Sequence, residues 1–266
     1  MAKKDILSSS KKIKRKRKFL KFSIWVIVLI LLLAGAVVAA RMERFKIKEV
    51  KLDNNNKLLQ NQISKDVLEI IGGQYFKILP KDNVFLLPQK EIETAILKKY
   101  PRIKSMILSV SLPDTILIKI EERTQEAILC YDKECGFLDK SGFVFEKAPY
   151  FSGDAYVKFI DEKSQGGSLA IGQNIIDAEK FDKIWTLTGL INKGGILITR
   201  VYIKEDNFFQ LLTKEGWRIL IDDKNEPQIT YENLSLALKE KIKDKRKNLD
   251  YIDLRFGNKV YFKYKK

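Results

Sequence analysis

The 266-residue chain contains no histidine. Because histidine is the commonest general base and imidazole metal ligand, its absence removes Ser-His-Asp and Cys-His catalytic arrangements. The sequence also lacks a G-x-S-x-G nucleophile elbow, a Walker loop and a dinucleotide-binding fingerprint, since its glycine pairs have other flanking residues. We therefore expect a protein that acts by binding, without a cofactor, a metal or a small-molecule substrate.

Two adjacent carboxylate pairs, Glu121-Glu122 and Asp222-Asp223, keep one enzymatic alternative open. Paired carboxylates perform acid and base work in glycoside hydrolysis, but neighbours on a strand point to opposite faces. A membrane-anchored cell-wall enzyme is therefore the weaker interpretation.

Charge is distributed unevenly along the chain. Residues 22–40 are 19 consecutive residues without a charge, and at about 1.5 Å per residue they cover roughly the hydrocarbon core of a bilayer. Residues 1–21 hold ten basic residues and one acidic residue, a net charge of +9. Such a basic flank predicts a cytoplasmic tail at 1–21, a transmembrane helix at 22–40 and an extracytoplasmic remainder.

A cleavable signal peptide has a similar basic start, and Ala39-Ala40-Arg41 offers a weak cleavage site. Its apolar core is usually only about 7–15 residues long, so we favour an uncleaved anchor. The total charge of +16 also suggests nucleic-acid binding. Beyond the tail, however, the 40 basic and 33 acidic residues are interspersed and leave only +7, which predicts a solvated surface and no nucleic-acid partner.

The first part of the outer region predicts a β-α-α-β-β order. Phe45 to Asp53 alternates like a strand, with a bulge near Lys48-Glu49, and Ser64 is the predicted cap of a helix that ends at Gly72-Gly73. The remaining predicted elements are a helix from Pro88 to Lys99 and a hairpin of strands Lys104 to Leu112 and Thr115 to Glu121.

Residues 124–266 predict a mixed domain with a mainly antiparallel sheet. A hairpin is expected over Gly136 to Phe145, and Asp177 is the predicted cap of a helix that carries Phe181, Ile184, Trp185, Thr188 and Ile191. The other predicted elements are strands Ile196 to Ile203, Phe208 to Leu212 and Trp217 to Ile221, a helix Ile229 to Lys243, and strands Tyr251 to Phe256 and Lys259 to Tyr264.

In this order the sequence resembles the FtsQ/DivIB family of bacterial cell-division proteins. The resemblance rests on Asn83-Val84-Phe85, Tyr100 to Ile103, Leu112 to Ile118, Glu121-Glu122-Arg123, Phe137 to Phe145 and Ile252 to Phe256. It implies an α+β fold with a POTRA domain at 45–123 and an FtsQ/DivIB-type β domain at 124–266. It also implies a non-catalytic protein of the plasma membrane at the division septum, which binds an FtsB/FtsL-like pair and helps regulate septal peptidoglycan synthesis. A POTRA protein for polypeptide transport is disfavoured, since residues 124–266 do not predict a β-barrel.

Cysteine is scarce: Cys130 and Cys135 bracket the polar loop 131–134. Outside the cytoplasm a disulfide is permitted, and strands flanking so short a loop bring Cα atoms within the required range of about 4.4–6.8 Å. We favour this bond over two free thiols. Two cysteines without histidine are too few ligands for a metal site.

The last strand is the candidate partner-binding site. An edge strand exposes unpaired backbone groups that another chain can extend, and the resemblance implies that the FtsB-like partner binds here. The predicted site comprises Asp253, Leu254, Arg255, Phe256, Lys259, Val260, Tyr261, Phe262 and Tyr264. Two alternatives stay open, namely that the aromatic residues form core and that Asp253 and Arg255 form a structural ion pair.

Overall fold

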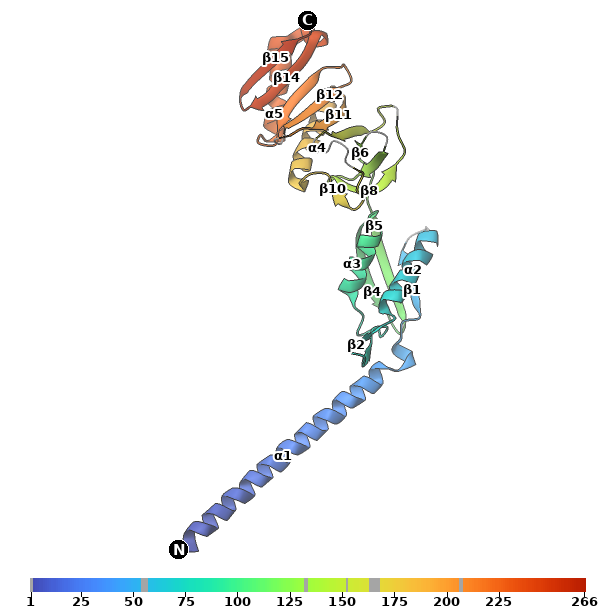
Figure 1. Cartoon of the computed structure of the whole chain (residues 1–266), viewed down its shortest axis with the longest axis vertical. Coiled ribbons are helices and arrows are strands. Elements are labelled where there is room, and N and C mark those ends of the chain that lie inside the picture. Colours follow the sequence, from blue (N-terminus) through green and yellow to red (C-terminus); the bar gives the residue numbers. More distant parts are fainter. Residues whose placement is uncertain (1, 54–56, 132–133, 152, 163–167, 206–207) are drawn as a thin grey trace. The chain divides into compact units, whose positions relative to one another are not determined.

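The computed structural model describes the chain except residues 1, 54–56, 132–133, 152, 163–167 and 206–207 (Figure 1). It divides into two compact units. The first comprises Met1–Leu97 and Ser105–Ile120, and the second comprises Lys98–Lys104 and Glu121–Lys266.

The first unit begins with the long helix α1 (Ala2–Ala40). Within α1, Lys18–Ala40 is long and apolar enough to cross a membrane, and none of its most apolar window is buried by the protein. The predicted span of residues 22–40 lies inside this segment. In the described part of the chain it is the single candidate span.

A three-stranded sheet and two helices follow α1. The strands are β1 (Glu49–Asp53), β4 (Ile103–Ser111) and β5 (Thr115–Glu122), in the order β1-β5-β4 with β1 parallel to β5. The helices are α2 (Lys57–Ile71) and α3 (Gln89–Lys99), separated by a hairpin of β2 (Gln74–Tyr75) and β3 (Leu79–Pro80). The predicted β-α-α-β-β order is confirmed, with this hairpin added. The core of the unit consists mainly of buried Ile63, Val67, Ile92, Ile96, Ile116 and Ile118.

Two local predictions in this unit are wrong. The strand predicted from Phe45 begins only at Glu49, because Phe45 belongs to a 3-10 turn and the Ile47 N–H donates to the Asp82 carbonyl at 2.8 Å. The alternating pattern shifts near Lys48 because the backbone changes its hydrogen-bonding partner there, from Asp82 at Ile47 to Asp114 at Lys48, and not because of a bulge. Ser64 does not cap α2 but lies inside it and donates to the Val50 carbonyl at 3.0 Å.

The second unit is built on a ten-stranded mixed sheet with the order β10-β8-β7-β6-β9-β11-β12-β13-β14-β15. Three neighbouring pairs, β6-β9, β9-β11 and β13-β14, are parallel, and the other six are antiparallel. The mainly antiparallel sheet is thus confirmed. The strand bounds are β6 Ala127–Tyr131, β7 Glu134–Leu138, β8 Phe143–Ala148, β9 Val157–Asp161, β10 Gln173–Asn174, β11 Ile198–Ile203, β12 Phe208–Thr213, β13 Arg218–Asp222, β14 Leu249–Phe256 and β15 Lys259–Tyr264.

Helix α4 (Ala178–Lys193) carries the predicted cap and the predicted apolar face. Asp177 accepts from the backbone N–H groups of Glu179 and Lys180 at 3.0 and 3.2 Å. The helix packs Phe181, Ile184 and Ile191 into the main core of the unit. This core also contains Trp217, the residue before β13, and Leu234 of α5 (Pro227–Leu236).

The helix predicted from Ile229 to Lys243 is interrupted. α5 ends at Leu236, a π-helical turn occupies Ala237–Ile242, and a 3-10 segment runs over Lys243–Asn248. Both ends of the π-helical turn, Ala237 and Ile242, are buried. Their separation of five residues matches the wider π turn better than the 3.6-residue period, which explains the difference from the prediction.

Candidate partner-binding edge

Strand β15 is the last strand in the order of the large sheet. Its partner on one side is β14, with Ile252 opposite Phe262 and Asp253 opposite Tyr261. Within the described residues, no strand pairs with its other side. The strand predicted at an edge therefore lies at one.

The backbone N–H and C=O groups of successive β15 residues point alternately toward β14 and toward the free side. The Lys265 N–H donates to the Asn248 carbonyl at 2.8 Å, so the backbone of Lys265 points toward β14. Both irregularities of register add residues to β14 and leave β15 regular. By alternation along an antiparallel strand, the N–H and C=O groups of Val260, Phe262 and Tyr264 point away from β14.

Two aromatic pairs flank this edge. The rings of Phe256 and Tyr261 meet edge to face with centroids 5.3 Å apart, and those of Phe262 and Tyr264 do so at 5.6 Å. Phe262 lies opposite Ile252, which is fully buried in the core beneath the helices. Tyr261 is its neighbour along the strand and so faces the other side of the sheet. One aromatic pair therefore stands on each face.

Some predicted site residues belong to the core rather than to the surface. Leu254 is 3% exposed, so its side chain has too little surface to contact a partner. The side chains of Val260 and Tyr264 are partly buried and pack against the main core. For these side chains the core alternative holds. Phe256, Lys259, Tyr261 and Phe262 remain exposed beside the free edge.

Asp253 and Arg255 form the ion pair considered as the structural alternative. The Arg255 Nε and Nη2 donate to the two carboxylate oxygens of Asp253 at 2.9 and 2.6 Å. The hydrogen bond to Asp253 raises the pKa of Arg255 further, so its charge is permanent. The guanidinium also lies 4.6 Å from the centroid of the Phe208 ring. This arrangement fixes the bulged end of β14 next to the edge strand.

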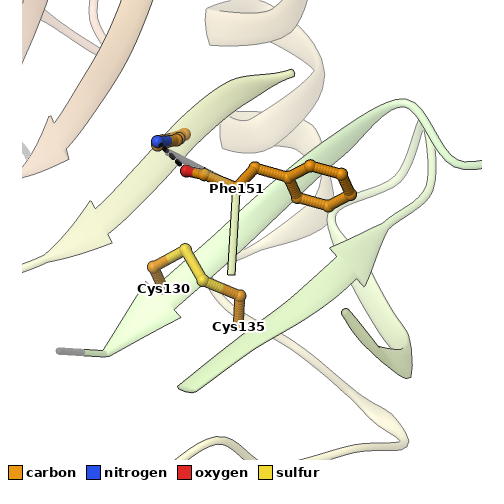
Figure 2. The surroundings of a disulfide bond; sticks show 4 residues. Cys130, Cys135 and Phe151 are labelled. Carbon is orange, nitrogen blue, oxygen red and sulfur yellow. Dashed lines mark hydrogen bonds between the residues drawn. A yellow bond between two sulfur atoms is a disulfide. The ribbon is translucent and has the colours of Figure 1, made fainter. Parts of the chain in front are cut away.

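The disulfide lies elsewhere on the same sheet. Cys130 of β6 and Cys135 of β7 face each other in the register and are bonded, with Cα atoms 4.2 Å apart. Figure 2 shows the bond crossing between the two strands beside Phe151. Both cysteines belong to a small buried cluster with Ile128, Phe137 and Phe145. The bond therefore stabilises the small cluster from within.

Each carboxylate of the two acidic pairs has a hydrogen-bond or ion-pair partner. Glu121 and Glu122 pair with Lys104 and Arg102, each at 2.8 Å. Asp223 pairs with Lys180 at 3.0 Å, and Asp222 accepts from the backbone of Lys224. Among the described residues, no group of three or more acidic or cysteine side chains is arranged to hold a metal.

Comparison with known proteins identifies the first domain. A family model described as "POTRA domain, FtsQ-type" matches residues 45–123, which contain the three-stranded sheet with α2 and α3. Over residues 45–123 the chain is therefore similar to the POTRA domain of FtsQ-type cell-division proteins. A curated relative, "Cell division protein FtsQ" of Syntrophotalea carbinolica (strain DSM 2380), is 28% identical over 125 residues. The match covers 47% of this chain and 40% of that relative.

Sequence reasoning missed one exposed apolar surface, on the first unit. Phe76 and Ile78 of the β2–β3 hairpin and nearby Phe85 are exposed. Phe85 was noted only as part of the family resemblance. Neither Phe76 nor Ile78 belongs to a periodic pattern, and the turn between β2 and β3 lacks the Asn-Gly signal of a tight hairpin.

Proposed function

We propose that this chain is a single-pass division protein that acts by binding alone. In this proposal residues 1–21 are cytoplasmic, α1 crosses the plasma membrane, and the two domains at 45–123 and 124–266 lie outside it. The family match supports the cellular role, and the unburied apolar segment Lys18–Ala40 supports the anchor.

The distal domain receives a strand of an FtsB-like partner on the free side of β15. The observation that carries this proposal is a sheet edge with outward backbone groups and an aromatic pair on each face, in which Phe256, Tyr261 and Phe262 are exposed. An added strand alternates its side chains above and below the sheet, so both pairs contact it. Backbone pairing supplies affinity, and the aromatic side chains supply selectivity.

The cellular consequence is the assembly of a divisome complex at the septum. Through the FtsB/FtsL-like pair, the protein helps organise and regulate peptidoglycan synthesis that other proteins catalyse. The POTRA domain serves recruitment near the membrane, while the distal domain captures the partner.

Site-specific photocrosslinking in dividing cells tests this assignment. A benzophenone amino acid replaces Phe262 in one variant and Tyr150 in a control variant, because Tyr150 is an exposed aromatic residue of the same unit away from β15. We expect position 262 to crosslink to a small single-pass protein that mass spectrometry identifies as FtsB-like, and position 150 not to do so. Equal crosslinking at both positions, or none at 262, would contradict the proposed edge.

A further inference from the structure

Two segments of the first unit, the β2–β3 hairpin and the turn at residues 83–86, meet the C-terminal end of α1. Arg41 donates through Nε and Nη2 to the Ile78 carbonyl of the hairpin at 3.2 and 2.9 Å. Asn83 donates through Nδ2 to the Ala40 carbonyl at 2.9 Å, which satisfies one of the free carbonyls at the helix end. The Tyr75 hydroxyl donates to the Leu86 carbonyl at 3.1 Å and joins the hairpin to the 83–86 turn. The hairpin and the turn are therefore fixed beside the end of the candidate span.

An apolar groove runs from this junction along the candidate span. It has a volume of about 460 Å³, and Leu33 and Val37 of α1 line it together with Leu79, Phe85 and Leu86. Leu33 lies seven residues before Ala40, a distance of about 10 Å along a helix. Side chains of the POTRA domain thus lie beside helix residues that acyl chains surround in a membrane.

The hairpin tip presents a phenylalanine at a conformational cost. Phe76 and Lys77 have positive φ angles of 49° and 59°, and the Ile78 N–H donates to the Tyr75 carbonyl at 2.9 Å, as in a type I′ turn. Such turns favour Asn-Gly, and a bulky side chain there is an outlier. Phe76 is nevertheless 90% exposed, so packing within the protein does not compensate the strain.

We propose that Phe76, Ile78 and Phe85 enter the interfacial layer of the bilayer at the Ala40 end of α1. Phe76 and Phe85 are 90% and 67% exposed, and lipid would bury them at the depth where the groove opens. The stem of Lys77 runs along this layer while its ammonium group reaches the anionic headgroups. The proposal depends on α1 spanning the membrane and not on partner binding at β15.

Depth-dependent quenching on the full chain in phosphatidylcholine and phosphatidylglycerol nanodiscs tests the contact. A polarity-sensitive fluorophore is attached to a cysteine at position 76 or 85, with Ile107→Cys as the control because Ile107 is an exposed apolar residue on β4 of the same unit. We expect brominated lipids to quench the probes at 76 and 85 at about 5–10 Å below the headgroup boundary, and aqueous iodide to quench only the probe at 107. Iodide quenching at 76 equal to that at 107 would overturn the proposal.

A turn-optimised variant separates lipid contact from folding. In the protein labelled at 85, the double substitution Phe76→Asn and Lys77→Gly supplies the preferred type I′ residues and removes the apolar tip. We expect a melting temperature at least as high as that of the parent and a loss of quenching by brominated lipid. Unchanged lipid quenching overturns the role of the tip. Concentration-dependent shielding of the probes in detergent overturns the proposal by assigning the surface to a second copy of the chain.

Discussion

Arg123 and Asp139 form an ion pair in which the guanidinium is held from three directions. Its Nη1 donates to Asp139 Oδ2, its Nε donates to the Pro101 carbonyl at 3.0 Å, and its Cζ lies 4.0 Å from the centroid of the Phe143 ring. The other oxygen of Asp139 accepts from the backbone N–H and hydroxyl of Ser141 and from the Phe143 N–H. One carboxylate therefore closes the β7–β8 turn and neutralises Arg123.

We predict that Asp139→Asn lowers the free energy of unfolding by about 2–4 kcal/mol at pH 7. Burial raises the pKa of Asp139, but the hydrogen bonds from Ser141 and Arg123 outweigh burial and hold the pKa below its usual value. The stabilisation is therefore complete above the unfolded pKa of about 3.9 and is lost as the pH falls through the lower folded pKa.

Urea unfolding of the full chain in detergent, followed from pH 7 to about pH 2, measures both effects. The parent should lose this part of its stability in acid, whereas Asp139→Asn should show a flatter pH dependence. Asp154→Asn is the matched control because Asp154 is exposed. A loss no larger than that of the control would show that the pair contributes little to stability.

The topology prediction concerns the position of the two domains relative to the membrane. The basic residues before α1 favour a cytoplasmic N-terminus. An alkaline phosphatase reporter fused after Lys266 should be active, and a cytoplasmic fluorescent reporter at the same place should be dark. The opposite result would place both domains in the cytoplasm and remove the basis for extracytoplasmic partner binding.

The disulfide prediction is that Cys130 and Cys135 are bonded in protein from its native membrane. Since both thiols are buried in the small cluster, alkylation is performed after denaturation, with and without reductant. Intact mass should show two added groups only after reduction. Two groups added without reductant would show free thiols in the cell.

The edge prediction uses proline at position 260. Because the Val260 N–H points away from β14, Val260→Pro should leave the β14–β15 pairing in place but remove a donor for a partner strand. Val260→Ala is the control for the lost packing of the side chain against the core. Binding to the purified partner complex should weaken at least tenfold more for the proline variant than for the alanine variant, about 1.4 kcal/mol. Equal affinities in two folded variants would place the interface elsewhere.

The anchor prediction concerns Phe262, which stands on the helix side of the edge. Phe262→Ala should weaken partner binding by at least about 1 kcal/mol if an added strand packs on this ring. Tyr150→Ala provides an exposed aromatic control in the same unit. Titration calorimetry measures the affinity, and thermal melting of each variant checks its folding. Wild-type affinity in folded Phe262→Ala protein would exclude this ring as an anchor.

Local patterns predicted many elements because each pattern reports a burial periodicity. Helix α4 shows this best, since Asp177 and the spacing of Phe181, Ile184 and Ile191 specify both its start and its buried face. The final strands were also predicted, and the edge position of β15 agrees with its exposed and aromatic composition.

The missed features depend on contacts that are distant in the sequence. β9 lies between β6 and β11, and its second residue, Lys158, is buried with its ammonium donating to the Phe151 carbonyl. A lysine at this position breaks the apolar pattern that predicts a buried strand. Ser64 resembled a cap because its role depends on Val50, fourteen residues earlier. The exposed hairpin at Phe76 was missed since its turn residues contradict the preference for its backbone conformation.

The composition of β15 also affects which chains can extend it. The strand contains two exposed lysines, Lys259 and Lys263, and no acidic residue. If two copies paired antiparallel about Tyr261, Lys259 of each would stand opposite Lys263 of the other, and like charges in that position are unfavourable. A strand with acidic residues at those places gains attraction instead. The same edge that is open to a partner thus opposes pairing between two identical chains in this register.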